Sequence, residues 1–87
     1  MDKKWYLYIL ECNDGTLYTG ITDDVEKRFN AHQSGKGAKY TRGRAPLQLR
    51  YTEVCDDHSA ALKREIQVKN LTKTQKMQLF QLQNEES

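Results

Sequence analysis

The sequence is poor in several features that mark whole classes of protein. Its 87 residues include two cysteines, Cys12 and Cys55, without C-x-x-C spacing, which excludes a disulfide scaffold. We expect both cysteines to be small buried side chains of the core. No run of about 18 apolar residues occurs and no apolar signal segment begins the chain, so we expect neither a membrane span nor export. These absences predict a cytoplasmic protein.

The size of the chain predicts a single domain over residues 1–87, with a core from about 5 to 82 and a frayed tail at 83–87. Only 37% of the residues are hydrophobic and 30% are charged. A chain of this length buries roughly 60–65% of its unfolded surface, so the core must be small.

Positive charge is concentrated in the middle of the chain. Residues 1–35 carry a net charge of −2, residues 36–76 carry +6, and residues 77–87 carry −2. A basic central segment suits a polyanionic partner, although a solvated basic face is the simpler alternative.

The order of expected elements is β-β-α-β-α-α, which predicts an α+β fold with a small three-stranded antiparallel sheet flanked by helices. Asp23 with Glu26, and Thr72 with Gln75, have the spacing of helix capping boxes. The strand patterns cover residues 5–12, 16–21 and 47–55, and the helix patterns cover about 24–34, 57–70 and 72–82. Residues 35–46, with three glycines and the single proline, are expected to form a loop.

The first two strands form a hairpin whose loop length decides where its tyrosines point. A two-residue turn would place Tyr8 and Tyr18 on opposite faces of the sheet. A three-residue loop ending in a left-handed Gly15 places them on one face, with Tyr8 opposite Gly20. We favour the second register, in which Gly20 leaves room beside Tyr8 for a ligand.

Each of the first two helices carries a charge inside its apolar arc. On a helical wheel, Arg28 lies within the apolar face of the first helix, and Glu65 lies near the middle of the arc that Leu62 and Ile66 help to form in the second. A charge that faces a core is costly unless it forms an ion pair or takes part in binding or catalysis. The pair is either a structural ion bridge or an anion site, in which Glu65 holds a divalent cation and Arg28 faces a phosphate.

These residues together resemble the GIY-YIG endonuclease superfamily. The paired signature is matched by residues 6–8 (Tyr-Leu-Tyr) and 18–20 (Tyr-Thr-Gly), and Arg28, His32 and Glu65 follow at the spacings of the family's helical arginine, its histidine or tyrosine, and its metal-binding glutamate. The resemblance covers about residues 5–82 and is greatest to the small stand-alone bacterial members. The same module occurs in the excinuclease C subunit.

The resemblance implies a mechanism. Glu65 binds Mg²⁺ or Mn²⁺ at the scissile phosphate, and Arg28 neutralises charge developing on the phosphate oxygens. Tyr18 acts as the base, with Tyr8 as its hydrogen-bond partner. His32 orients a tyrosine or contacts phosphate, unless it is simply a packed helix histidine.

The loop at residues 35–44 carries four cations and no acid. Its glycines would let backbone amides approach phosphate, and Tyr40 could stack on a base. Lys69, one turn after Glu65, either contacts phosphate or lies along the surface. The expected nucleic-acid-binding residues, besides Gly20, are Lys36, Lys39, Tyr40, Arg42, Arg44 and Lys69. A flexible, solvated loop is the alternative.

The sequence therefore predicts a divalent-metal-dependent endonuclease that hydrolyses phosphodiester bonds in DNA, in repair or recombination. A protein partner would supply target specificity, because the chain has no room for a second DNA-binding domain. The alternatives are a nucleic-acid-binding module of the same fold with little activity of its own, and a protein-interaction domain.

Overall fold

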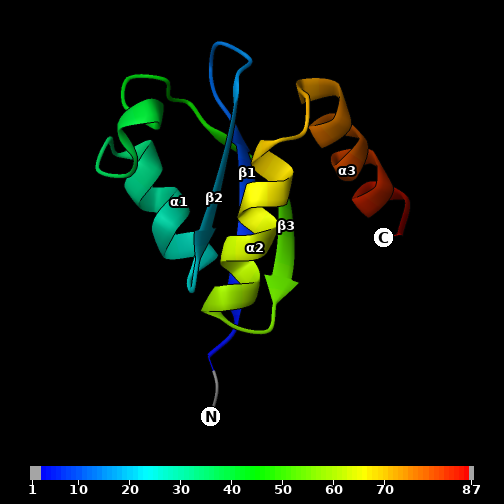
Figure 1. The fold of residues 1–87 in the computed structure, drawn as a ribbon. Coiled ribbons are helices and arrows are strands. Elements are labelled where there is room, and N and C mark those ends of the chain that lie inside the picture. Colours follow the sequence, from blue (N-terminus) through cyan, green and yellow to red (C-terminus); the bar gives the residue numbers. More distant parts are fainter. Residues whose placement is uncertain (1–2, 87) are drawn as a thin grey trace.

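A computed structural model describes residues 3–86 (Figure 1). Three strands, three α-helices and one short 3₁₀ turn make up the fold, in an order that confirms the expected α+β class. The elements are β1 (Trp5–Glu11), β2 (Leu17–Thr22), α1 (Val25–Gln33), the 3₁₀ turn η1 (Lys39–Thr41), β3 (Gln48–Cys55), α2 (His58–Lys69) and α3 (Lys73–Glu86). None of the described helices is long and apolar enough to cross a membrane.

The sheet is antiparallel with strand order β2-β1-β3. Its register is the one that the three-residue loop predicts: Tyr8 pairs with Gly20 and Leu10 with Tyr18. Gly15 ends the loop with a φ of 83°, a left-handed conformation that glycine adopts without steric cost. The prediction that Tyr8 and Tyr18 share one face is confirmed.

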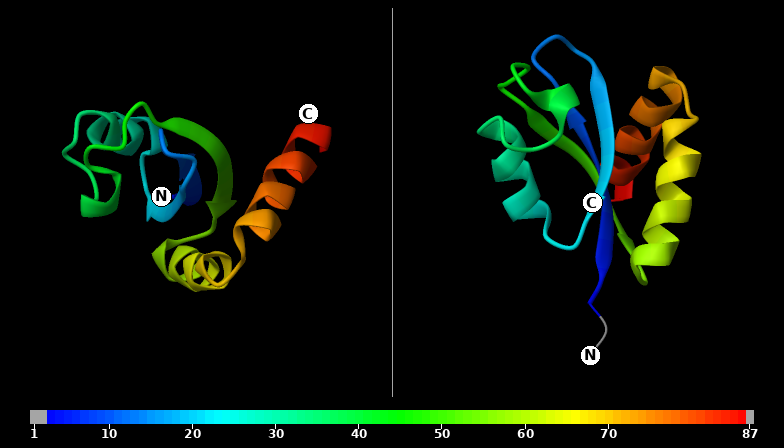
Figure 2. Two further views of the ribbon diagram at one scale, coloured as in Figure 1. Left: turned by 90° about the horizontal axis from the view of Figure 1, so that it is seen from above. Right: turned by 60° about the vertical axis from the view of Figure 1, so that its left-hand side comes forward.

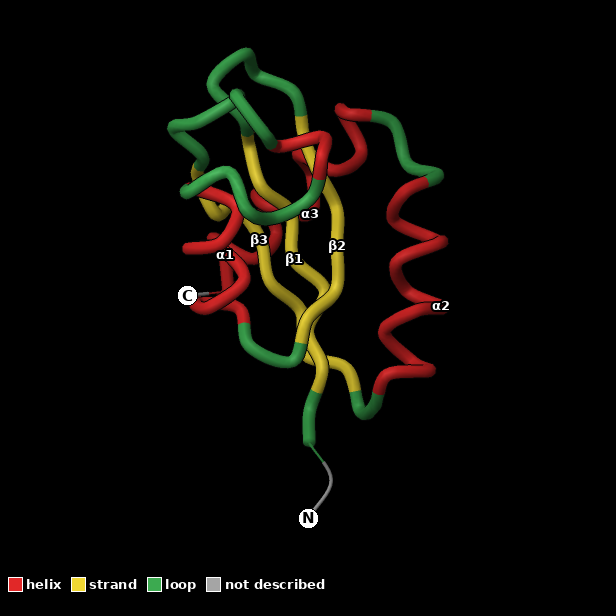
Figure 3. Tube along the Cα trace, turned by 90° about the vertical axis from the view of Figure 1, so that its left-hand side faces the viewer, coloured by secondary structure: helices red, strands yellow, loops and turns green. Residues whose placement is uncertain are grey.

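Alternation along β1 divides the core into two clusters on opposite faces of the sheet. Leu7 and Ile9 pack with Val68 of α2 and Phe80 of α3. The other face carries Tyr8, Leu10, Cys12 and Leu47, against which Tyr18 and Phe29 of α1 pack. The tube view accordingly shows α1 and α2 on either side of the strands (Figure 3), and the view from above shows α3 following α2 around the sheet (Figure 2). Both cysteines are buried and free, as expected.

A polar network ties β3 to α2 beneath this helix. The Arg64 guanidinium donates to the Glu53 carboxylate through Nε (2.7 Å) and Nη2 (3.2 Å). The Tyr51 hydroxyl donates to the same carboxylate at 2.7 Å. Arg64 and Glu53 are both about two-thirds buried, so the bidentate pair is partly shielded from water.

Two helix boundaries differ from the expected ones. The N-cap of α1 is Asp24, whose side chain accepts from the Lys27 amide, and not Asp23, which is paired with Lys3. The capping box of Thr72 with Gln75 is present, but α3 continues to Glu86 instead of ending near Leu82. The helix end is therefore later than expected, the fraying of residues 83–87 stays a prediction, and Ser87 lies outside the described residues.

Only half of the predicted apolar face of α2 is buried. Ala61 and Val68, at one flank of the predicted arc, are fully buried against the sheet. Leu62 and Ile66, at the other flank, are 41% and 63% exposed. The buried direction of the helix is therefore rotated away from the centre of the arc, because the narrow sheet covers one flank only.

Candidate active site

A buried chain of hydrogen bonds joins the central strand to α1 and to the loop that follows it. The Tyr8 hydroxyl lies 2.8 Å from His32 Nε2, and His32 Nδ1 lies 2.8 Å from Thr41 Oγ1. Thr41 in turn donates to the Ala38 carbonyl, and the Ala38 amide donates to His32 Nδ1 at 3.3 Å. His32 and Thr41 are fully buried, and so is almost all of Tyr8.

Charge around the Tyr8 hydroxyl comes from several elements. Burial raises the pKa of Tyr8 to about 12, and the Arg28 guanidinium beside the hydroxyl opposes that rise. Negative charge on Tyr18 or Glu65 would raise the pKa further, which places both groups within electrostatic reach of Tyr8. Burial, helped by the Arg28 charge, lowers the pKa of His32 to about 4, so this ring is neutral at pH 7.

Gly20 has a different role from the expected one. A Cβ built at this position would lie 2.5 Å from Tyr8 Oη and 2.7 Å from Tyr8 Cζ. The space that the missing side chain leaves is therefore filled by the Tyr8 phenol, and not free for a ligand. The glycine is required because the phenol lies directly over the backbone of the neighbouring strand.

Tyr18 is covered by an aromatic and cationic stack. The ring of Tyr40 stacks on that of Tyr18 with centroids 5.8 Å apart, and the Arg44 guanidinium lies 4.5 Å from the centroid of Tyr40. Arg44 also forms an ion pair with Asp14 in the hairpin loop. Tyr40 therefore already has an aromatic partner within the chain, although 43% of its surface is exposed.

Glu65 lies on the part of α2 that flanks the buried face, and its side chain is 19% exposed. Its partner is Lys69, whose Nζ is 3.4 Å from Glu65 Oε2. Within residues 3–86 no ion pair joins Arg28 to Glu65, so the structural-bridge alternative is wrong. The two charges instead approach Tyr8 from different helices.

The donor set around Glu65 suits a hard cation that keeps most of its waters. Across the described residues, no three His, Cys, Asp or Glu side chains gather into a metal-binding group. Mg²⁺ uses one or two carboxylates and takes its other ligands from water and substrate phosphate. The mostly buried Glu65 carboxylate fits that requirement, with Lys69 as the group that it would have to release.

The basic loop is fastened to the rest of the molecule at both ends. Its first part is held at His32 by Ala38 and Thr41, and its end is held at the hairpin by a hydrogen bond from the Asn13 amide to the Arg44 carbonyl. Figure 1 shows the loop and the hairpin turn at the same end of the molecule. The exposed cations of the loop are Lys36, Lys39 and Arg42. Binding of nucleic acid by these cations and the alternative of a flexible, solvated loop both stay predictions.

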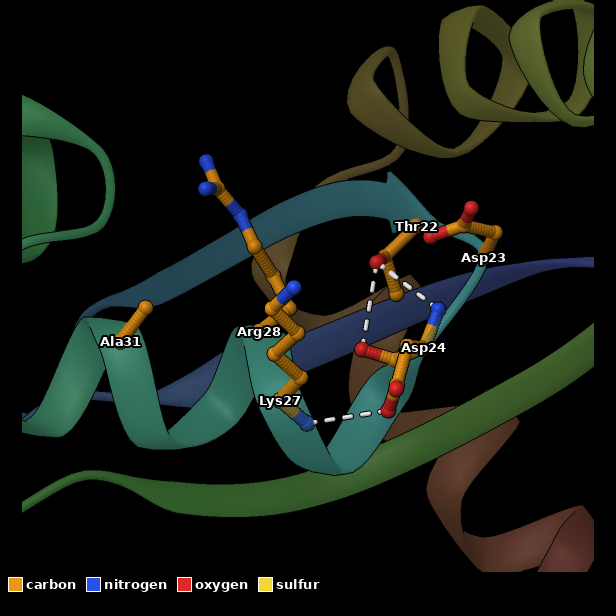
Figure 4. Close-up of a pocket in the computed structure, with 6 residues that line it drawn as sticks. All are labelled: Thr22, Asp23, Asp24, Lys27, Arg28 and Ala31. Atoms are coloured by element: carbon orange, nitrogen blue, oxygen red, sulfur yellow. Dashed lines mark hydrogen bonds between the residues drawn. The ribbon is translucent and has the colours of Figure 1, made fainter.

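A shallow cavity of about 260 Å³ lies at the other end of α1. Thr22, Asp24 and Lys27 line it together with Arg28, whose side chain extends away from Thr22 and Asp24 (Figure 4). Its lining carries two acids, Asp23 and Asp24, and two bases, Lys27 and Arg28, and Asp23 is paired with Lys3 at 2.9 Å.

Sequence reasoning missed two residues of the buried chain. Thr41 contacts His32 through its hydroxyl, and a Cβ at Gly37 would lie 2.3 Å from His32 Nδ1, so the loop backbone packs directly on the ring. Neither residue belongs to a periodic pattern. Their only sequence signal is their place in the glycine-rich run at residues 35–42.

The model of the GIY-YIG catalytic domain matches residues 4–78. The chain belongs to the GIY-YIG family. It is 52% identical over 75 residues to a UPF0213 protein of Halobacterium salinarum, covering 86% of this chain and 97% of that protein. It is 43% identical to a UPF0213 protein of Oceanobacillus iheyensis, covering 99% and 100%.

Two solved structures are similar to this GIY-YIG chain. The solution NMR structure of a UPF0213 protein from Bacillus halodurans matches with a TM-score of 0.59 and 49% identity, covering 91% of this chain and 84% of that one. The solution NMR structure of a protein from E. faecalis matches with a TM-score of 0.68 and 41% identity, covering 99% and 92%. Family membership establishes a nuclease-type domain.

Proposed function

We propose that this protein is a divalent-metal-dependent endonuclease that hydrolyses phosphodiester bonds in DNA. The observation that supports it is the convergence on one phenol. Tyr8 is hydrogen-bonded to His32, lies beside Arg28, and is within electrostatic reach of Tyr18 and Glu65. Groups from two strands and two helices rarely meet at one mostly buried polar point without a chemical use.

Arg28 is proposed to bind the scissile phosphate and to neutralise the charge that develops on its oxygens. Its guanidinium can donate two parallel hydrogen bonds to a phosphate, and its place beside the Tyr8 hydroxyl brings the phosphate to the tyrosines. Arg28 forms no ion pair within the described residues, so its charge remains available to a substrate.

The two tyrosines are proposed to handle the proton of the attacking water. Tyr8 is protonated at neutral pH, since its pKa is raised to about 12, and it therefore acts as a hydrogen-bond donor. Tyr18, whose ring centroid is 6.3 Å from that of Tyr8 and which is less buried, takes the role of base. The arrangement divides donor and acceptor between two otherwise identical side chains.

Glu65 is the proposed ligand of the divalent cation. When bound there, Mg²⁺ or Mn²⁺ would supply Lewis-acid stabilisation of the leaving oxygen. The protein's own contribution is to hold one carboxylate mostly out of water next to the phenol cluster. Lys69, released from Glu65, would then be free to contact a neighbouring phosphate.

The exposed cations of the loop are proposed to hold the DNA backbone beside this site. Lys36, Lys39 and Arg42 contact phosphates without reading sequence, so target choice, in repair or recombination, would come from DNA structure or from a partner protein.

The deciding experiment is cleavage of labelled duplex, branched and single-stranded DNA with Mg²⁺, with Mn²⁺ and with EDTA. We expect metal-dependent cleavage that Glu65→Gln abolishes while its melting temperature stays within a few degrees of wild type. Glu26→Gln, on the exposed face of α1, is the matched control and should cleave normally.

One further candidate function is a binding module without activity, favoured by the Lys69 pairing that occupies Glu65. It would be supported if no substrate were cleaved and DNA bound equally well in EDTA. Metal-dependent cleavage by both Glu65→Gln and wild type would instead assign the activity to another site.

A further inference from the structure

The turn between α2 and α3 is a second concentration of positive charge. Residues 66–84 contain three lysines, Lys69, Lys73 and Lys76, and no acidic residue. Lys69 is paired with Glu65, whereas Lys73 and Lys76 form no ion pair in the described part of the chain. Like charges that a fold brings together repel one another unless an anion lies nearby. This segment therefore carries positive charge that the protein itself leaves unbalanced.

The stability of α3 does not explain these lysines. The first turn of a helix is stabilised by acidic side chains and destabilised by cations, because the helix N-terminus carries partial positive charge. Lys73 is the first residue of α3 and Lys76 is its fourth, and the first turn contains no acid. Where a local rule of stability is broken in this way, the gain is expected in binding or catalysis.

The three lysines form one cluster beside the hairpin loop. Partial burial and the neighbouring charge of Lys69 both lower the pKa of Lys76, so these two ammonium groups are within electrostatic reach of each other. The Lys73 ammonium lies 3.8 Å from the place where a Cβ at Gly15 would be, so it reaches the hairpin loop. Lys69, Lys73 and Lys76, the α2–α3 cluster, therefore extend from the neighbourhood of Glu65 to the hairpin.

The two signs of charge are concentrated at opposite ends of the molecule. The starts of α1 and α2 lie at one end, and the hairpin loop, the basic loop and the α2–α3 turn lie at the other (Figure 1). The acids next to the two helix starts are Asp23, Asp24, Glu26, Asp56 and Asp57. Lys3 and Lys4 pair with only two of them. At the basic end, the basic loop and the α2–α3 turn flank the hairpin on opposite sides (Figure 1).

We propose that the α2–α3 cluster is a second binding surface for the DNA backbone, and that one duplex lies across the basic end of the molecule and contacts this cluster and the basic loop together. A backbone with one charge per phosphate suits cations on both sides of the hairpin, whereas a small anion would meet one side only. The inference deepens the proposed function and rests on it for the identity of the polyanion.

This arrangement places the proposed active site between two groups of phosphate contacts. Lys69 is one helical turn from Glu65, so the α2–α3 cluster begins beside the proposed metal ligand. The basic loop is fastened at His32, on the other side of the phenol cluster. Cleavage within a chain, and not at its end, requires DNA to be held on both sides of the scissile phosphate.

The test is the salt dependence of duplex DNA binding in EDTA, which keeps divalent cations out of the measurement. Fluorescence anisotropy of a labelled duplex gives the binding constant over a series of salt concentrations. Lys73→Ala with Lys76→Ala should make the slope of the double-logarithmic plot shallower by about 2, because two phosphate contacts are lost. Lys73→Arg with Lys76→Arg keeps both charges and should keep the wild-type slope. An unchanged slope in the alanine variant would overturn the inference.

Two controls separate the cluster from net charge and from the fold. Lys27→Ala with Lys63→Ala removes the same charge from exposed positions on α1 and α2 and should leave the slope unchanged. An equal change in this variant would overturn the inference, because net charge alone would then attract DNA. The alanine variant of α3 should melt at or above the wild-type temperature, since two cations leave the positive end of the helix. A clearly lower melting temperature with an unchanged slope would assign the lysines a structural role.

Combined substitutions test whether one duplex contacts both groups of cations. Alanine at Lys36, Lys39, Lys73 and Lys76 together should make the slope shallower by about 4, with one duplex bound per protein when DNA is in excess. Two duplexes per protein would refute the bridging arrangement. The expected slopes in a protein that cleaves nothing would leave this inference standing and refute the proposed nuclease. Metal-dependent cleavage with an unchanged slope in the α3 variant would refute this inference alone.

Discussion

At the scale of the single residue, the buried His32 ties stability to pH. Its pKa is lowered from 6.5 to about 4, so the folded protein binds a proton at this ring more weakly than the unfolded chain does. The resulting stabilisation is complete above about pH 6.5 and is lost as the pH falls toward 4. It amounts to about 3 kcal/mol at most.

The measurement is an NMR titration of the His32 ring together with urea denaturation at pH 7 and pH 4.5. We expect a ring midpoint near 4 and a drop in the free energy of unfolding that is smaller in His32→Gln, which has no imidazole to protonate. A ring that titrates near 6.5 would contradict the prediction.

Another residue-scale prediction concerns Thr19, whose Oγ1 is buried without a hydrogen-bond partner in the part of the chain that the structure describes. An unpaired buried hydroxyl is destabilising, and valine keeps its shape. Thr19→Val should therefore raise the free energy of unfolding by about 1 kcal/mol, measured by urea denaturation.

Thr16→Val is the matched control on the same hairpin, because the Thr16 hydroxyl donates to Asp14 at 2.6 Å. It should not stabilise the protein. If both substitutions changed the free energy of unfolding equally, the change would come from removing a hydroxyl as such. It would then not depend on whether that hydroxyl had a hydrogen-bond partner.

At the scale of the element, the link between β3 and α2 depends on the Glu53 carboxylate. Glu53→Gln would leave the mostly buried Arg64 guanidinium without a carboxylate, with only neutral amide oxygens, Gln67 Oε1 among them, as acceptors, and would weaken the contact with Tyr51. We expect a loss of about 1–3 kcal/mol in the free energy of unfolding. The change should appear in urea denaturation followed by circular dichroism.

Lys63→Ala, on the exposed side of α2 and one residue from Arg64, should change stability by less than about 0.5 kcal/mol. If Glu53→Gln were as mild as Lys63→Ala, the bidentate pair would contribute nothing to holding α2.

The elements also show how far sequence reasoning reaches. The hairpin register was predictable, because side-chain parity and Gly15 leave one loop length that puts both tyrosines on one face. The orientation of α2 was not predictable. A helical wheel gives the width of the apolar arc, but it does not give the width of the sheet surface that covers the helix. Leu62 and Ile66 are therefore exposed.

The candidate site was predictable only in part, for a similar reason. Arg28 and His32 sit at fixed helical spacing, so their shared face could be derived from the sequence. The contacts of Gly37 and Thr41 with His32 depend on the path of an irregular loop, which has no period. Their part in the site becomes visible only in three dimensions.

At the scale of the whole molecule, the uneven charge predicts a specific salt dependence. In residues 3–86, Lys36, Lys39 and Arg42 form no ion pair, whereas Arg44 is held by Asp14 and Lys69 by Glu65. The logarithm of the binding constant for duplex DNA should fall linearly as the logarithm of the salt concentration rises. Lys36→Ala with Lys39→Ala should make the slope shallower by about 2.

A double substitution of Lys27 and Lys63 by alanine removes the same charge from the exposed faces of α1 and α2. Its slope should equal that of wild type when affinity is measured over a series of salt concentrations. Equal changes in the two double variants would show that net charge alone, and not the loop, attracts DNA.

The parity of β1 has a consequence for how this molecule can diverge. Leu7 and Ile9 face the larger core with α2 and α3, whereas Tyr8 between them faces the hydrogen-bonded cluster on the other side. Neighbouring positions of one strand are therefore held by different contacts. A substitution at Tyr8 would disturb the hydrogen-bonded cluster and leave the packing of Leu7 and Ile9 in place, so one face of the sheet could change while the larger core persists.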